Sequence, residues 1–239
     1  MAAPRGGYFR LESGYISATF RLLMAALTFR ELTPETWPDF ERLFRGPGGN
    51  DQCWCMYYRR EQSAEKEIAA FDIKKGGFHE HNRRRIEALV HEGRAHGILA
   101  YSGNEPVGWC AYGRKEEFPR VDRGRAYRKL SPPPEVVWRI VCFVVAVGHR
   151  RKGVAAAALR VALESIRSQG GGPVEAYPVT GPRWGAGSLW FGTVAMFERE
   201  GFQKVTELGT SVLVRKLVRP SRARSARRAT RNRGGGAHD

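Results

Sequence analysis

The chain has 239 residues, of which 42% are hydrophobic and 11% are aromatic, so it can bury one sizeable core and has the composition of an ordinary globular protein. Its formal net charge of +16 is unevenly distributed, because seven arginines and no acid lie between Arg219 and Arg233. No apolar run approaches the roughly 20 residues that a membrane helix needs, which argues against a membrane-spanning protein.

The four cysteines do not form the paired framework of a small secreted protein, and two of them, Cys110 and Cys142, lie in apolar segments. We therefore expect a cytoplasmic protein. Residues 1–25 make a poor signal peptide, since arginines are scattered through them. We expect an N-terminal extension there, either disordered or upstream of the native start.

The first regular segments follow this extension. Alternation over residues 27–30 predicts a strand, and Thr33-Pro34-Glu35 reads as the N-cap and first turn of a helix that runs to about Phe44. The aromatic segment CWCMYYRR at residues 53–60 comes next. It either lines a pocket for an amine, whose charge aromatic faces attract, or packs as a flap on the core.

A metal site could also be imagined in this region. It would pair Cys53 and Cys55 with His79 and His81. Single-residue spacings differ from the two- to four-residue separation that structural zinc sites use between cysteines. We therefore expect no metal.

Residues 82–92 show helical periodicity, with Asn82 as a candidate N-cap. Two apolar runs, 97–101 and 106–112, predict a hairpin that turns at Ser102-Gly103-Asn104-Glu105. A long polar segment then leads to residue 135, and long loops in compact domains often shape functional sites. Its candidate carboxylates are Glu116, Glu117 and Asp122, although solvated loop charge is the plainer interpretation.

The most informative stretch covers residues 136–168. Its β-branched first part, 136–147, predicts a buried central strand, and the alanine-rich part after Gly153 predicts a helix with an apolar stripe. The turn between them is basic. Free amides and the dipole of the first helical turn favour a phosphate at such a place, although similar turns occur in crossovers without a ligand.

Four further elements and a tail complete the chain. Residues 174–179 predict a strand, 189–200 a helix, and 202–207 with 210–218 two closing strands. The pattern indicates a single α/β (α+β) domain over residues 26–218, with a mixed central sheet flanked by helices. Residues 219–239 lack core residues and are expected to form a disordered tail, whose arginines could bind nucleic acid.

Two ordered motifs give this pattern a family resemblance. Residues 150–155, RRKGVA, resemble the Arg/Gln-x-x-Gly-x-Gly/Ala signature of the GNAT (Gcn5-related N-acetyltransferase) superfamily, and WFGTVAMFEREGF at 190–202 resembles its late helix with the following Gly-Phe. The resemblance covers roughly residues 26–218. It is strongest to uncharacterised bacterial acetyltransferase-like sequences.

The resemblance implies acetyl-CoA as cosubstrate and direct attack of a primary amine on its thioester. The pantetheine would pair with Val145, Ala146 and Val147. The pyrophosphate would bind the turn and first helical residues Arg150, Arg151, Lys152, Gly153, Val154 and Ala155.

The same comparison shows two departures in the catalytic residues. The glutamate base that many members carry on the central strand is Arg139 here, and the tyrosine acid of the late helix is Phe197. An arginine cannot act as a base. We expect Tyr177 and Glu117 to act instead, and a thiol with a pKa near about 8.5 can also leave with little acid assistance.

Three hypotheses follow. The first is an acetyl-CoA-dependent N-acyltransferase acting on an amine of a small molecule or peptide. The second is a non-catalytic CoA-binding module, which the two departures would explain. The third is a basic protein that binds nucleic acid through the tail. Assembly into a homodimer stays open.

Overall fold

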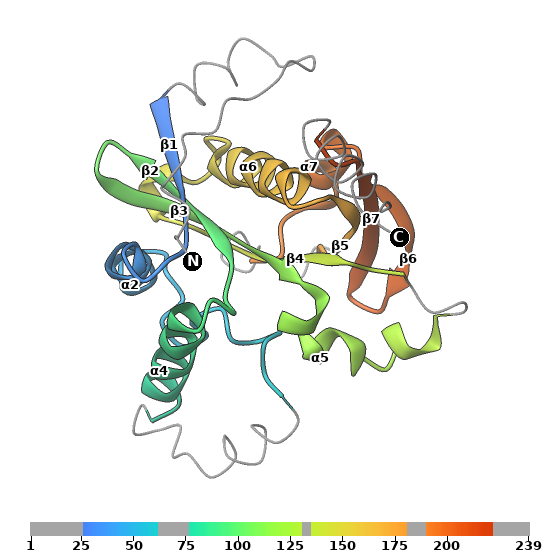
Figure 1. Ribbon diagram of the computed structural model, residues 1–239, viewed down its shortest axis with the longest axis horizontal. Helices are drawn as coiled ribbons and strands as arrows, with labels where there is room; N and C mark the ends of the chain where they lie inside the picture. Colours follow the sequence, from blue (N-terminus) through green and yellow to red (C-terminus); the bar gives the residue numbers. More distant parts are fainter. Residues whose placement is uncertain (1–25, 62–76, 131–134, 181–189, 222–239) are drawn as a thin grey trace, which may run out of the picture.

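The computed structural model describes residues 26–61, 77–130, 135–180 and 190–221, which build one mixed sheet with helices on both faces (Figure 1). In the described residues the sheet has seven strands in the order β1-β2-β3-β4-β5-β7-β6. They are β1 (Leu27–Glu31), β2 (Gly97–Ser102), β3 (Glu105–Arg114), β4 (Trp138–Val145), β5 (Gly172–Ala176), β6 (Gln203–Leu208) and β7 (Ser211–Val218). The predicted fold class is confirmed.

Neighbouring strands pair antiparallel except for β4 and β5, which are parallel. Helix α6 (Val154–Ser168) provides the crossover between these two, as a parallel pair requires. The hairpin of β2 and β3 is also as predicted, with its turn between Ser102 and Glu105. The central strand β4 therefore lies between a tightly joined hairpin and a strand that reaches it over a helix.

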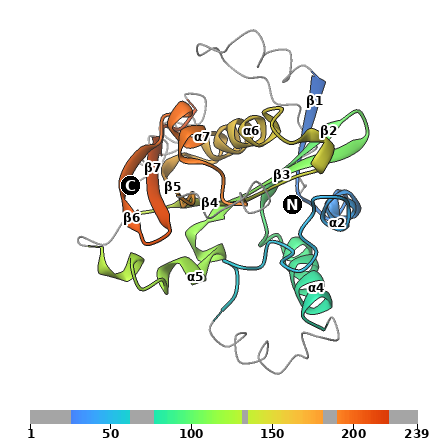
Figure 2. The same ribbon diagram turned by 180° about the vertical axis from the view of Figure 1, so that it is seen from behind.

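Helices lie on both faces of the sheet (Figures 1 and 2), and each face buries its own core of side chains. One core holds α6 and α7 (Val194–Arg199), and its alanines at 158 and 162 let α6 lie close to the sheet. The opposite core holds α2 (Trp37–Arg45) and α4 (Gly77–His91). Short turns follow β3: η2 (Lys115–Glu117), α5 (Pro119–Asp122) and η3 (Tyr127–Lys129). Within the described ranges no helix is long and apolar enough to cross a membrane.

Two predicted helix starts were wrong. Helix α2 begins at Trp37 and not at Pro34, because Thr36 closes a turn by accepting from the Thr33 amide and donating to the Glu31 carbonyl. Helix α4 begins at Gly77, so Asn82 lies inside it and is no cap. The buried Asn82 side chain instead donates to the Gln52 carbonyl at 2.7 Å. Both residues use their polar groups for contacts outside the helix.

The late helix is shorter than predicted. Helix α7 begins at Val194, where the Thr193 side chain accepts from the Met196 amide, and ends at Arg199. Residue 189, the first of the predicted helix, lies outside the described residues together with 181–188, as do residues 1–25 and 222–239. The predicted extension and most of the predicted tail therefore stay predictions.

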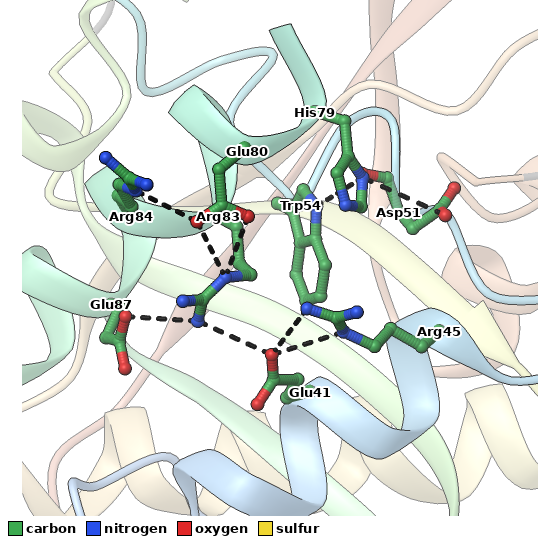
Figure 3. Close-up of polar contacts among 9 residues, drawn as sticks. All are labelled: Glu41, Arg45, Asp51, Trp54, His79, Glu80, Arg83, Arg84 and Glu87. Atoms are coloured by element: carbon green, nitrogen blue, oxygen red, sulfur yellow. Dashed lines mark hydrogen bonds and ion pairs between the residues drawn. The ribbon is translucent and has the colours of Figure 1, made fainter. Parts of the chain in front are cut away.

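An ion network joins α4 to α2 (Figure 3). Arg83 lies between three glutamates, at 3.4 Å from Glu41, 3.2 Å from Glu80 and 3.1 Å from Glu87. Beside it, the Trp54 indole nitrogen lies 3.2 Å from His79 Nδ1. These contacts fix α4 over the loop that follows α2, which contributes residues to the candidate site.

Candidate functional site

Strands β4 and β5 separate halfway along β4. Their pairing runs only from Trp138↔Val174 to Ile140↔Ala176, whereas β4 continues to Val145. Against β3, Ala111 pairs with Cys142 and Tyr112 with Ile140, so Val141 is an extra residue that forms a bulge. Beyond Ile140, one edge of β4 is therefore left without a neighbouring strand.

The backbone of this open edge is partly engaged. The Phe143 amide donates to the Trp190 carbonyl at 2.6 Å, and the Ala146 amide donates to Val107 on the opposite, paired side. The backbone N–H and C=O groups of successive strand residues point to alternate edges of the strand, so those of Val145 point to the same open edge as those of Phe143. The Val147 amide donates to the Pro47 carbonyl. Of the three residues predicted to pair with pantetheine, Val145 presents its amide to the opening, whereas its carbonyl accepts from Arg150 Nε.

The basic turn connects β4 to α6 through η4 (Val147–His149). Arg151 and Gly153 both have positive φ, 60° and 84°, and such a conformation in a non-glycine residue is a recognised mark of functional loops. The first intrahelical bond runs from the Ala157 amide to the Gly153 carbonyl, so the amides of Val154 and Ala155 have no partner within the helix. This end of α6 can receive an anion.

The Arg150 side chain connects this turn to two neighbouring segments. Its Nε donates to the Val145 carbonyl at 3.0 Å and its Nη2 to the Gly48 carbonyl at 3.1 Å. The side chain therefore joins the end of β4, the basic turn and the loop after α2. Arg151 and Lys152, by contrast, are exposed and can face a phosphate.

A cavity of about 170 Å³ lies where β4 bulges. Its lining combines β4 with the loop after α2 and the segment before α7. The lining residues are Asn50, Cys53, Cys55, Tyr57, Tyr58, Val141, Cys142, Trp190 and Phe191. None of these described residues is acidic, so the cavity suits an apolar or aromatic group. Three of the four cysteines in the chain meet here, which the sequence did not reveal.

The metal site considered for Cys53, Cys55, His79 and His81 is not formed by these side chains in the structure. Among the described residues no group of three His, Cys, Asp or Glu side chains could hold a metal ion. Cys55 instead accepts from the Trp109 indole at 3.3 Å, and His79 lies against Trp54.

Tyr177 lies beneath the cavity, in a buried polar cluster. Its ring centroid is 6.2 Å from that of Tyr58, which lines the cavity. Its hydroxyl donates to Glu175 at 3.0 Å and accepts from Arg139 Nε at 3.0 Å. Burial raises the pKa of Tyr177 well above its usual value. The assignment of Tyr177 to proton transfer stays a prediction.

Glu117 lies elsewhere, in a second and larger cavity of about 630 Å³. It accepts from Arg59 Nη1 at 2.9 Å and lies 2.8 Å from His96 Nδ1. Burial opposes its ionisation, but the His96 contact and the Arg59 charge outweigh burial and lower the pKa of Glu117. The structure does not bring Glu117 and Tyr177 together. Of the other candidate carboxylates, Asp122 pairs with Arg139 and Glu116 is exposed.

The two departures noted in the sequence are both fully buried. Arg139 donates to two tyrosine hydroxyls, two backbone carbonyls and Asp122, and has no exposed surface. Phe197 packs edge-on against Phe143 and Phe202, with ring centroids at 6.0 and 5.1 Å. Neither position offers a proton acceptor or donor to the open edge of β4.

The chain was compared with proteins of known structure and with family models. Similar solved structures include an acetyltransferase from Thermus thermophilus (16% identity, 80% of this chain and 97% of that chain covered, TM-score 0.44). They also include the PaiA N-acetyltransferase of Thermoplasma acidophilum in complex with coenzyme A (9%, 80% and 98%, 0.46). A third is the ribosomal-protein-S18-alanine N-acetyltransferase of Escherichia coli (9%, 82% and 96%, 0.41).

No curated protein matches the chain. The model of the acetyltransferase (GNAT) family, however, matches residues 57–179, more than half of the chain, including the bulged strand, the basic turn and α6. The chain therefore belongs to the GNAT acetyltransferase family.

Proposed function

We propose that this protein transfers an acetyl group from acetyl-CoA to a primary amine of a small molecule or peptide by direct attack. The family implies acetyl-CoA-dependent N-acetyl transfer in general. The observation that supports the proposal most is the continuity of three features along β4. The strand loses its neighbour after Ile140, a cavity opens at Val141, and the strand ends in a basic turn with free helix amides.

In this proposal the cofactor lies along the open edge of β4. Its pantetheine pairs with the backbone of the Val145–Val147 segment, chiefly at Val145. Its pyrophosphate contacts the segment from Arg150 to Ala155, where the exposed Arg151 and Lys152 add positive charge. No metal takes part in the proposed reaction. The domain responsible is residues 26–218.

The acceptor enters the cavity beside Val141 and Cys142. Aromatic walls from Tyr57, Tyr58 and Trp190 favour an amine on an apolar or aromatic skeleton, and they attract its ammonium form by cation–π contact. The amine nitrogen must lose a proton before it attacks the thioester carbon. A cytoplasmic location, which four free thiols favour, and a homodimer stay predictions.

The test uses the full chain and a pair of Gly153 variants. Gly153 has a φ of 84°, a conformation that Asn and Asp adopt more readily than other non-glycine residues. Gly153→Asn and Gly153→Asp have nearly the same shape and strain but differ in charge. We expect calorimetric titration to show acetyl-CoA binding by the wild type and by Gly153→Asn. Binding by Gly153→Asp should be weaker than by Gly153→Asn by at least about tenfold, or about 1.4 kcal/mol.

Turnover is then measured as release of free CoA thiol from acetyl-CoA in the presence of phenylethylamine and other primary amines. A well-folded wild type that binds no acetyl-CoA contradicts the proposal. Binding without turnover of any amine would support the alternative of a non-catalytic CoA-binding module.

A further inference from the structure

A second cavity lies beside α4 and has no described lining residue in common with the cavity at the β4 bulge. Helices α4 and α5 lie on the same face of the sheet, with the chain that follows α2 passing between them (Figures 1 and 2). The volume of about 630 Å³ is that of a small-molecule site. The lining residues are Met56, Arg59, Arg60, Glu61, His81, Asn82, Arg85, Leu89, Gly93, Arg94, His96, Arg114, Glu116, Glu117 and Pro119.

The charges in this lining favour an anion. The lining contains five arginines and three glutamates. One of the glutamates, Glu117, is already engaged, since it lies 2.9 Å from Arg59 Nη1 and 2.8 Å from His96 Nδ1. The other two, Glu61 and Glu116, are exposed, so solvent and salt screen their charge. The cavity therefore keeps an excess of positive charge.

The buried part of the lining has polar groups to spare. Arg59 is 5% exposed and Asn82 is 1% exposed. Within the described part of the chain, Arg59 Nε and Asn82 Oδ1 have no hydrogen-bond partner. Buried polar atoms normally have a partner in the protein or in ordered solvent. A donor and an acceptor left over in the lining of one cavity indicate that a polar guest completes it.

Two exposed arginines at the rim of the cavity come from separate elements. Arg85 lies on α4, and Arg114 ends β3 with its guanidinium over the Trp138 ring, 3.8 Å from the ring centroid. Neither forms an ion pair with another described residue. The planar guanidinium fork matches the oxygens of carboxylate and phosphate groups. The rim can therefore receive such a group without breaking an existing ion pair in the described structure.

Residues 53–60 form a segment that the two cavities share. Cys53, Cys55, Tyr57 and Tyr58 line the first cavity, whereas Met56, Arg59 and Arg60 line the second. The Arg59 amide donates to the Met56 carbonyl at 3.0 Å, so both linings depend on one short stretch of backbone. Tyr57 is 42% exposed, and its side chain keeps rotamer freedom that a bound acceptor must remove.

We propose that the second cavity binds a small anion that bears carboxylate or phosphate groups, and that this anion acts as an effector of the acceptor site across the shared segment. The binding site is independent of the proposed function, whereas the effector role rests on it. An anion in the second cavity fixes the segment from the side of Arg59 and Arg60. Tyr57 and Tyr58 on the other side then lose less freedom when the amine binds, so the KM for the amine falls.

The first test measures anion binding by the full chain in titration calorimetry. Citrate supplies carboxylate groups and glucose 6-phosphate supplies a phosphate, while glucose is the uncharged control. The buffer contains no phosphate or sulfate, which would compete for the site. We expect the wild type to bind citrate or glucose 6-phosphate and not to bind glucose.

Matched pairs of variants locate the bound anion. Arg85→Gln and Arg114→Gln remove charge from the rim, and their controls are Arg84→Gln and Lys115→Gln, at adjacent exposed positions outside the lining. Each rim variant should weaken binding of the charged ligand by about three- to tenfold, between the effects of an exposed ion pair and a buried charged hydrogen bond. The controls should change it by less than about twofold. Circular dichroism checks that all four variants are folded.

The basic turn before α6 is the competing location for an anion. Arg151→Gln removes an exposed charge from that turn and leaves the second cavity intact. We expect this variant to bind citrate and glucose 6-phosphate as the wild type does. Binding that is lost in Arg151→Gln and kept in both rim variants would place the anion at the turn and overturn the inference.

The second test measures turnover with saturating acetyl-CoA and phenylethylamine as acceptor. The anion that binds in the first test should lower the KM for the amine by at least about threefold and leave kcat unchanged. Arg114→Gln should need a higher anion concentration for the same effect. Sodium chloride at equal ionic strength is the control, because a general salt effect would act through screening and not through the cavity.

Two further results would overturn the inference. They are a wild type that binds neither citrate nor glucose 6-phosphate, and rim variants that bind the anion as tightly as the wild type. Binding with an unchanged KM would refute the effector role. A wild type that binds no acetyl-CoA or acetylates no amine defeats the proposed function and the effector role with it, whereas the anion titrations still decide whether the site exists.

Discussion

The Arg139 guanidinium donates to both carboxylate oxygens of Asp122, at 2.9 Å from Nη1 and 2.5 Å from Nη2. Arg139 is fully buried, whereas the Asp122 side chain is 53% exposed. The pair therefore joins a charge in the centre of the sheet to a carboxylate at the surface.

This asymmetry predicts unequal effects of removing each partner. Arg139→Met leaves two tyrosine hydroxyls and two carbonyls without their donor and breaks a buried ion pair, which should lower the free energy of unfolding by about 3–5 kcal/mol. Asp122→Asn keeps one acceptor oxygen in contact with water and should cost about 1–3 kcal/mol. Urea unfolding measures both, and equal losses would contradict the prediction.

The Glu117 carboxylate should make stability depend on pH. Its pKa is lower in the folded protein than its ordinary value of 4.5, so its contribution is fully present above about pH 4.5. That contribution is lost as pH falls through the lower, folded-state pKa. Melting temperatures of the wild type and Glu117→Gln, measured from neutral to acidic pH, should therefore differ most at neutral pH and converge in acid. A constant difference would show that charge plays no part.

Restoring the usual tyrosine at position 197 should not improve the enzyme. Phe197 is fully buried between Phe143 and Phe202, and a hydroxyl there would lose its hydration. Phe197→Tyr should therefore cost about 1–3 kcal/mol in urea unfolding. Its kcat for acetyl-CoA and phenylethylamine should not rise. Phe197→Leu is the control that loses packing without adding a hydroxyl, and a rise in kcat in the tyrosine variant alone would restore a catalytic role to this position.

The Arg83 network should contribute modestly and be sensitive to salt. Its side chain is 20% exposed and contacts glutamates on two helices. Arg83→Gln should lower the free energy of unfolding by roughly 1 kcal/mol at low ionic strength, and by less in about 1 M salt, where the Debye length is only about 3 Å. The control is Arg85→Gln, at an exposed position on the same helix. An effect that is independent of salt would indicate packing and not charge.

The sequence predicted the central unit well because local patterns determine it. Strand β4 and helix α6 follow from a β-branched run, a glycine-containing turn and an alanine-rich stripe. The starts of α2 and α4 were predicted wrongly because the side chains of Thr36 and Asn82 do not cap these helices as the local sequence suggests. The Thr36 side chain donates to the Glu31 carbonyl, and the Asn82 side chain donates to the Gln52 carbonyl.

The candidate site was only partly predictable. The basic turn has a local signature, whereas the cavity at the β4 bulge combines Cys55 and Cys142 from two elements that are far apart in the sequence. Nothing in the sequence at either position distinguishes a thiol that lines a cavity from one that packs in the core. The burial of Arg139 could not be predicted either, because its ion-pair partner Asp122 lies in a separate element, α5.

The bond from the Phe143 amide to the Trp190 carbonyl has a consequence for affinity. A ligand that pairs with β4 at this position must first displace a group of the protein itself. The chain therefore competes with its own ligand, and the observed dissociation constant exceeds the intrinsic one by the inverse of the fraction of molecules in which Trp190 has withdrawn. Association measured at high ligand concentration should then level off at the rate of that withdrawal, so this one hydrogen bond can set how fast the site fills.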